Sequence, residues 1–178
     1  MNKRKVGIID ATILLDFIAG DIFDTLFFLP VEFLTSDFVA DEVSKTYSFE
    51  DLEGFGLQVL ELSEEQMLEI EVLQGHHPEL SPSDLSVYIL AKSMTALLIS
   101  GDSPLREMAE TQGIEYHGTL WLLEELITRG LLSPENAACA LDTMLDNKRW
   151  LPRQECEKLM KKWKSRHEHF FPPPLAIS

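Results

Sequence analysis

Residues 6–10 have the sequence VGIID, and residues 95–102 have the sequence TALLISGD. Each is a short apolar run that ends at an aspartate, which is typical of a buried strand in a parallel sheet. Helical spacing of apolar residues follows each run, so strands and helices alternate along the chain. This alternation predicts a three-layer α/β/α fold with a central parallel sheet.

Three further strands are expected, with helices in the segments between strands. The strands cover residues 31–35, 57–62 and 114–118. Serine caps, early prolines and glycine or proline stops delimit the helices. The helices cover residues 13–18, 22–29 and 37–46, begin again at Ser63, extend from Ser81 to Met94, and extend from Ser103 to Gly113.

Residues 119–166 show only helical patterns, with further helix starts at Ser133 and Pro152. We therefore predict an α/β domain over residues 1–118, with this helical extension packed on it. Residues 167–178 contain three consecutive prolines and are expected to form a flexible tail.

The first helix of the extension is apolar on more than one face. Its apolar residues are Leu120, Trp121, Leu122, Leu123, Leu126, Ile127, Leu131 and Leu132. Such a helix is buried against its own domain and against a second chain, which predicts a homodimer; the alternative is that the last two helices cover it. Trp121, Trp150 and Trp163 are expected to pack in a core rather than to stack on bases.

The composition is that of a soluble globular protein, with 178 residues, 45% hydrophobic and 25% charged. Two cysteines without metal-ligand spacing predict free thiols in a reducing compartment. The apolar stretch near the N-terminus is interrupted by Asp10 and Asp16 and lacks a signal-peptide cleavage site. We therefore expect a cytoplasmic protein without a membrane partner.

Four acidic residues are expected to meet at one edge of the sheet. Asp10 and Asp102 follow strands, while Glu42 and Asp84 lie in helices that would pack on the same sheet. Clustered carboxylates repel one another unless divalent cations neutralise them, and oxygen-only ligation favours Mg²⁺ or Mn²⁺. Such ions generate a hydroxide nucleophile and stabilise the charge that develops on a phosphodiester.

Each acid also has a simpler interpretation when it is considered alone. Asp10 could cap the following helix, and Asp84 could stabilise a helix start through the helix dipole. Glu42 could be a solvated helix residue, and Asp102 a turn residue. Only the joint pattern favours a metal site.

Four motifs in order resemble those of the PIN-domain family. They are IIDATILLDF at 8–17, FVADEV at 38–43, LSPSDLSVYILA at 80–91 and LLISGDSPLREMA at 97–109. The resemblance covers residues 6–118, and residues 118–133 resemble a helical extension of toxin-like prokaryotic members. It implies a metal-dependent ribonuclease, such as the toxin of a toxin–antitoxin pair.

The resemblance also implies roles for individual residues. The metal-binding catalytic acids correspond to Asp10, Glu42, Asp84 and Asp102. Thr12 stands where the family often has Asn or Ser, and Ser100 where Thr is common; both are expected to orient the metal or a bound water. Apart from the resemblance, the position of Arg106 one turn into the helix after Asp102 predicts either a contact to a phosphate or a salt bridge.

Positive charge is concentrated at the end of the chain. The net charge is −15, yet residues 148–178 carry 8 basic and only 3 acidic side chains. Lys158, Lys161 and Lys162 are candidate contacts for RNA, because a positive patch offsets the repulsion from an acidic body. The alternative is that this helix docks on the chain's own acidic surface.

Competing functions are separated by single residues. A non-catalytic protein with the same fold would be favoured by the loss of one of the four acids, and none is lost. A haloacid-dehalogenase phosphatase needs an aspartate where Thr12 stands. A receiver domain needs paired acids before Asp10, where only basic residues occur. The sequence does not decide between RNA and DNA, or name a target.

Overall fold

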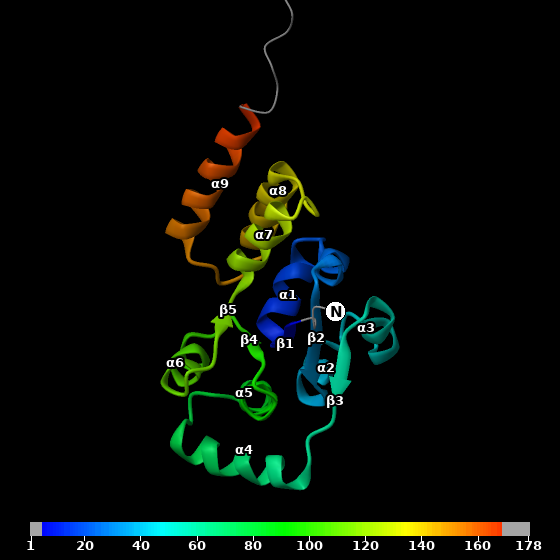
Figure 1. The fold of residues 1–178 in the computed structure, drawn as a ribbon, viewed down its shortest axis with the longest axis vertical. Helices are drawn as coiled ribbons and strands as arrows, with labels where there is room; N and C mark the ends of the chain where they lie inside the picture. The colour runs from blue at the N-terminus through cyan, green and yellow to red at the C-terminus, as the bar shows by residue number, and fades with distance from the viewer. Residues whose placement is uncertain (1–4, 169–178) are drawn as a thin grey trace, which may run out of the picture.

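A five-stranded parallel sheet forms the centre of the protein (Figure 1), as seen in a computed structural model that describes residues 5–168 and the side chains as far as residue 165. The strand order is β3-β2-β1-β4-β5, and every neighbouring pair is parallel. The strands are β1 (Lys5–Ile9), β2 (Val31–Ser36), β3 (Gln58–Leu60), β4 (Leu97–Ile99) and β5 (Tyr116–His117). The predicted α/β fold with five strands is therefore confirmed.

Helices lie between successive strands and cover the sheet. They are α1 (Ala11–Ala19), the 3-10 helix η1 (Phe23–Phe28), α2 (Asp37–Val43), α3 (Phe49–Phe55), α4 (Glu64–His76), α5 (Pro82–Met94) and α6 (Ser103–Thr111). The strand order reverses beside β1, which has β2 on one side and β4 on the other. In a sheet of this kind, ligands bind outside the carboxyl ends of the strands at the reversal point. Asp10 lies at that point, directly after β1.

Several element boundaries differ from the prediction. The short helix predicted over 22–29 is the 3-10 helix η1, which spans Phe23–Phe28. The predicted strand over 95–100 begins only at Leu97, because Thr95 adopts a left-handed conformation with φ of 50° and ends α5. Helix α3 was not predicted; it begins at a capping box in which Ser48 and Asp51 bond reciprocally, and it ends at Gly56, where φ is 110°.

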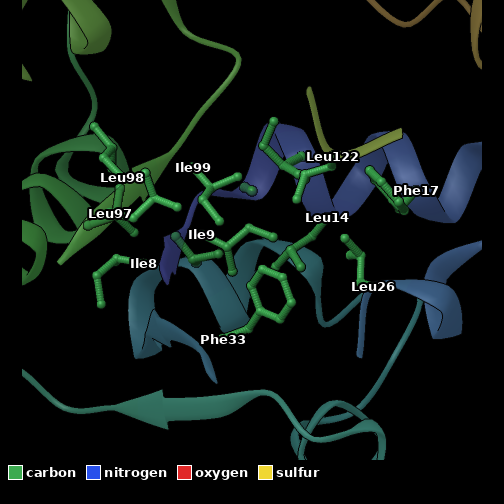
Figure 2. Close-up of a cluster of buried hydrophobic side chains, with 14 of the residues drawn as sticks. Ile8, Ile9, Leu14, Phe17, Leu26, Phe33, Leu97, Leu98, Ile99 and Leu122 are labelled. Carbon is green, nitrogen blue, oxygen red and sulfur yellow. The ribbon is translucent and has the colours of Figure 1, made fainter. Parts of the chain in front are cut away.

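The main core joins the central strands to α1 (Figure 2). Ile9, Leu14 and Phe17 are fully buried and lie with Phe33 from β2. Leu122 from the helical extension reaches the same cluster. The extension therefore completes the core of the α/β domain.

The extension consists of α7 (Thr119–Thr128), α8 (Pro134–Asp146) and α9 (Arg153–Glu168). Leu122, Leu123 and Leu126 of α7 are fully buried within this single chain. Cys156 and Trp163 of α9 are also buried, so packing holds α9 on the rest of the extension. The tail predicted over 167–178 lies outside the described residues from position 169 onward.

The tryptophans do not share one role. Trp163 is buried, as predicted, but the prediction was wrong for Trp150, whose side chain is 100% exposed. Trp150 lies in the segment that joins α8 to α9, where the chain leaves the packed helices.

Among helices within residues 5–168, none is long and apolar enough to cross a bilayer.

Candidate active site

Asp10 is held rigidly at the reversal point of the sheet. Its backbone N–H donates to the Ile99 carbonyl at 3.0 Å, which ties the end of β1 to β4. Its Oδ1 accepts from Thr12 Oγ1 at 2.7 Å and from the Ile13 N–H at 3.0 Å, which caps α1. The Ser100 hydroxyl donates to Oδ2. The side chain is 1% exposed, so these contacts fix its direction.

The environment of Asp10 disfavours negative charge. Burial raises the pKa of Asp10 to about 6, and the charge of Asp84 also raises it. The hydrogen bonds from Ser100, Ile13 and Thr12 act in the opposite direction. A carboxylate in such a place is stabilised by a nearby cation.

Asp102 is coupled to Asp10 through two hydroxyl groups. Its backbone N–H donates to Ser100 Oγ at 3.0 Å, and the Gly101 N–H donates to Thr12 Oγ1 at 3.1 Å. Ser100 and Thr12 therefore connect the two strand-end aspartates. Burial raises the pKa of Asp102, as does the charge of Asp84.

Asp84 and Glu42 approach the same region from α5 and α2. Asp84 Oδ2 accepts from the backbone N–H of Ser81 at 2.8 Å and from its hydroxyl at 2.7 Å, forming the capping box of α5. Glu42 Oε2 accepts from Ser83 Oγ at 3.0 Å, which links α2 to the start of α5. Asp84 therefore stabilises the start of α5 and lies at the same time near Glu42 of α2.

The carboxylates form an electrostatic group and not a closed coordination shell. Asp84 raises the pKa of both Asp10 and Asp102, so these three charges act on one another. Within the described residues, no three Asp, Glu, His or Cys side chains are placed so that they could hold a metal ion. The donor chemistry nevertheless fits a hard divalent cation: all donors are oxygen atoms, and their mutual repulsion is the kind that a cation relieves.

Arg106 lies beside this group. Its Nε donates to the Ser100 carbonyl at 2.7 Å, and its guanidinium carbon lies 5.8 Å from the centre of the Tyr116 ring. A Cβ atom at Gly118 would lie 2.0 Å from Arg106 Nη2, so glycine leaves the room that the guanidinium occupies. Among the described residues, no carboxylate lies within ion-pair distance of Arg106. The salt-bridge alternative is therefore wrong for this conformation.

A cavity of about 350 Å³ lies beside the acidic group, between the α/β domain and the extension. Sequence reasoning missed it, because it is formed by residues far apart in the chain. The lining residues are Gly101, Arg106, Tyr116, His117, Gly118, Thr119, Leu120, Trp121, Trp150, Leu151, Pro152 and Glu155.

Two of the three candidate lysines of α9 are paired with carboxylates of the chain. Lys158 Nζ lies 2.9 Å from Glu155, and Lys162 forms an ion pair with Glu124 of α7. Lys161 is exposed and has no ion-pair partner among the described residues. The pair between Lys162 and Glu124 shows that α9 docks on an acid of its own chain.

Comparison with protein families identifies the chain. The model of the family described as DUF3368, PIN domain, matches residues 6–165. The chain belongs to the PIN-domain family. The match runs from β1 through most of α9, so it includes the helical extension.

Two solved structures are similar to this PIN protein. A PilT N-terminus domain protein from the archaeon Sulfolobus solfataricus P2 is 15% identical, with a TM-score of 0.45, over 67% of this chain and 91% of that chain. VapBC2 from Rickettsia felis, bound to a DNA fragment from its promoter, is 14% identical, with a TM-score of 0.46, over 64% of this chain and 98% of that chain. No curated protein matches the chain.

Proposed function

We propose that this PIN protein is an endoribonuclease that depends on Mg²⁺ or Mn²⁺, with Asp10, Glu42, Asp84 and Asp102 as its metal-binding catalytic residues. The observation that carries the proposal is electrostatic. The negative charge of Asp84 raises the pKa of both strand-end aspartates, Asp10 and Asp102. Three like charges gathered at the reversal point of a parallel sheet favour a divalent cation as their counter-charge.

The protein's own groups position the reaction. Thr12 and Ser100 fix the carboxylate of Asp10, whose Oδ2 receives one hydrogen bond and retains a lone pair for a ligand. Arg106 acts against the raised pKa of Asp102, and a positive charge at this place would also stabilise a phosphate bound at the acids. A divalent ion bound here would supply an activated water and stabilise the charge of in-line displacement.

Conversion of Asp10 to asparagine tests the proposal. Asp10→Asn keeps the shape of the side chain and the cap of α1 but removes the negative charge. Cleavage of single-stranded RNA in Mg²⁺ or Mn²⁺ should therefore fall by about 100-fold or more, as when one group that stabilises a transition state is removed. Asp41→Asn, at an exposed acid beside Glu42, is the matched control and should cleave at the wild-type rate. Equal rates for Asp10→Asn and wild type would refute the assignment.

The alternative is a PIN-fold protein that acts through nucleic-acid or protein binding without catalysis. The observation in its favour is that no three metal-ligand side chains within the described residues are placed to hold an ion. Titration calorimetry with Mn²⁺ separates the two functions. Binding that is lost in Asp10→Asn supports the nuclease, whereas absence of Mn²⁺ binding supports the alternative.

A toxin role with an antitoxin partner rests on the resemblance of residues 118–133 to the extension of toxin-like members. The sequence of the neighbouring gene tests this role, because a small open reading frame that encodes a DNA-binding domain would indicate a toxin–antitoxin pair.

A homodimer stays a prediction, and so does a cytoplasmic location. Leu122, Leu123 and Leu126 are buried within the chain, so a dimer would use other residues, such as the 37% exposed Leu131.

A further inference from the structure

The cavity beside the acidic group is walled by planar side chains. His117 and Trp121 stack with ring centres 4.0 Å apart and an angle of 11° between the rings. The guanidinium of Arg106 lies over Tyr116 on the same side of the molecule. Planar aromatic and guanidinium groups are the surfaces on which nucleic-acid bases stack.

Trp150 contributes a further ring to the lining of the cavity. Its side chain is 100% exposed, which is unusual for a residue that normally buries most of its large apolar surface. The preceding residue is nevertheless anchored, because the Arg149 side chain donates to Asp16 at 2.6 Å and to the Thr12 carbonyl at 3.1 Å. Trp150 is thus an exposed ring on a fixed support.

The charges around the cavity favour a base over an isolated phosphate. Arg106 is the cationic residue among those that line it, and its Nε is already committed to the Ser100 carbonyl. Glu155, at the same rim, adds negative charge, which Lys158 offsets. Stacking is therefore the main interaction that the cavity can offer to a ligand.

The cavity reaches the neighbourhood of the acidic group at Gly101, which lines it and directly precedes Asp102. A strand with its phosphodiester at the acids would place a neighbouring nucleotide at the cavity. We propose that this cavity binds one base of a single-stranded nucleic acid, held between Trp150 and the stacked pair of His117 and Trp121. The position of this base relative to the cleaved bond rests on the proposed nuclease function; the stacking contact itself does not.

A binding experiment in EDTA tests the contact without cleavage. The protein is titrated into two labelled strands, a uridine hexanucleotide and a hexamer with the same phosphate backbone but no bases. Fluorescence anisotropy gives the dissociation constant for each strand. Wild type should prefer the strand with bases. Trp150→Ala should reduce this preference by roughly 5-fold or more, since one base–aromatic stack is worth about that factor or more. Its affinity for the strand without bases should stay unchanged.

Phe28→Ala is the matched control, since Phe28 is a 60% exposed aromatic on η1 that does not line the cavity. It should keep the wild-type preference. An unchanged preference in Trp150→Ala would overturn the proposal. The proposal would also be overturned if Trp150→Ala bound RNA normally but had a lower mass in sedimentation, because Trp150 would then contact a second protein chain. The nuclease proposal is tested separately, and it fails if Asp10→Asn cleaves RNA at the wild-type rate.

Discussion

The carboxylate of Asp16 accepts a hydrogen bond from Arg149 Nε at 2.6 Å, across 133 residues of sequence. Asp16 lies on α1 and Arg149 in the segment between α8 and α9. The other oxygen of Asp16 accepts from Thr119 Oγ1, also at 2.6 Å, at the start of α7. One buried acid therefore joins the α/β domain to the start of α7 and to the segment between α8 and α9, where Arg149 directly precedes Trp150.

Loss of either partner should loosen the extension. Asp16→Ala leaves Arg149 without its counter-charge. Arg149→Ala leaves Asp16, which is 4% exposed, buried without a counter-charge. Removal of one member of a buried ion pair lowers the free energy of unfolding by about 3–5 kcal/mol. Because Arg149 is partly exposed, we expect a loss of about 3 kcal/mol. Urea unfolding measures it. The exposed Arg153→Ala is the control and should unfold at the wild-type midpoint; the proposed role fails if all three variants unfold together.

Asp10→Asn should stabilise the metal-free protein while it slows cleavage. The pKa of Asp10 is about 6 in the folded chain, well above that of an unfolded aspartate. Ionisation at pH 7 therefore opposes folding by up to about 3 kcal/mol, and the neutral amide removes this cost. Thermal unfolding in EDTA at pH 7 should show a higher midpoint for Asp10→Asn than for wild type or Asp41→Asn. A lower midpoint would mean that lost hydrogen bonds outweigh the relief of charge.

The same group sets a pH dependence with a defined sign. Between about pH 4 and 6 the folded chain retains the Asp10 proton that the unfolded chain has released. The folded state binds more protons in this window, so the free energy of unfolding falls as pH rises, and the contribution levels off above pH 6. Urea unfolding of the metal-free protein across this window should show a steeper fall for wild type than for Asp10→Asn. Parallel curves would place the pKa of Asp10 elsewhere.

The sheet and the strand-end positions of Asp10 and Asp102 were predictable because their signals are local. Apolar runs that end at Asp10 and Asp102 mark buried strands, and the rule that ligands gather at strand carboxyl ends brings the two together. Helix α3 was missed although its apolar residues recur at every third position from Phe49 to Phe55, because the segment is only 7 residues long. The cavity could not be predicted at all. Its walls come from Arg106, Trp121 and Trp150, and only the packing of the extension brings them together.

Gly118→Ala should displace Arg106 without disturbing the core. The new Cβ would lie 2.0 Å from Arg106 Nη2 and 3.2 Å from the Ser100 carbonyl oxygen. The guanidinium must therefore move away from Ser100, and RNA cleavage should fall by roughly 10-fold, close to the effect of Arg106→Ala. The double variant should be no worse than either single one, because both remove the same contact. Gly75→Ala, where a Cβ meets nothing within 4 Å, is the control.

The role of α9 in RNA binding depends on Lys161. Truncation would remove the buried Trp163 and unfold the extension, so charge reversal is the better experiment. Lys162 is already paired with Glu124, whereas Lys161 is exposed and has no ion-pair partner among the described residues. If α9 guides RNA, Lys161→Glu should weaken binding and reduce the slope of log affinity against log salt by about 0.7, the value for one phosphate contact on a single strand.

Lys5→Glu is the control for that experiment, because Lys5 lies at the amino end of β1, away from the acidic group. It changes the net charge of the protein by the same amount, so general repulsion affects both variants equally. A larger effect of Lys161→Glu then identifies a local contact. Equal slopes for the two variants would show that α9 balances the acidic surface of its own chain and does not touch the RNA.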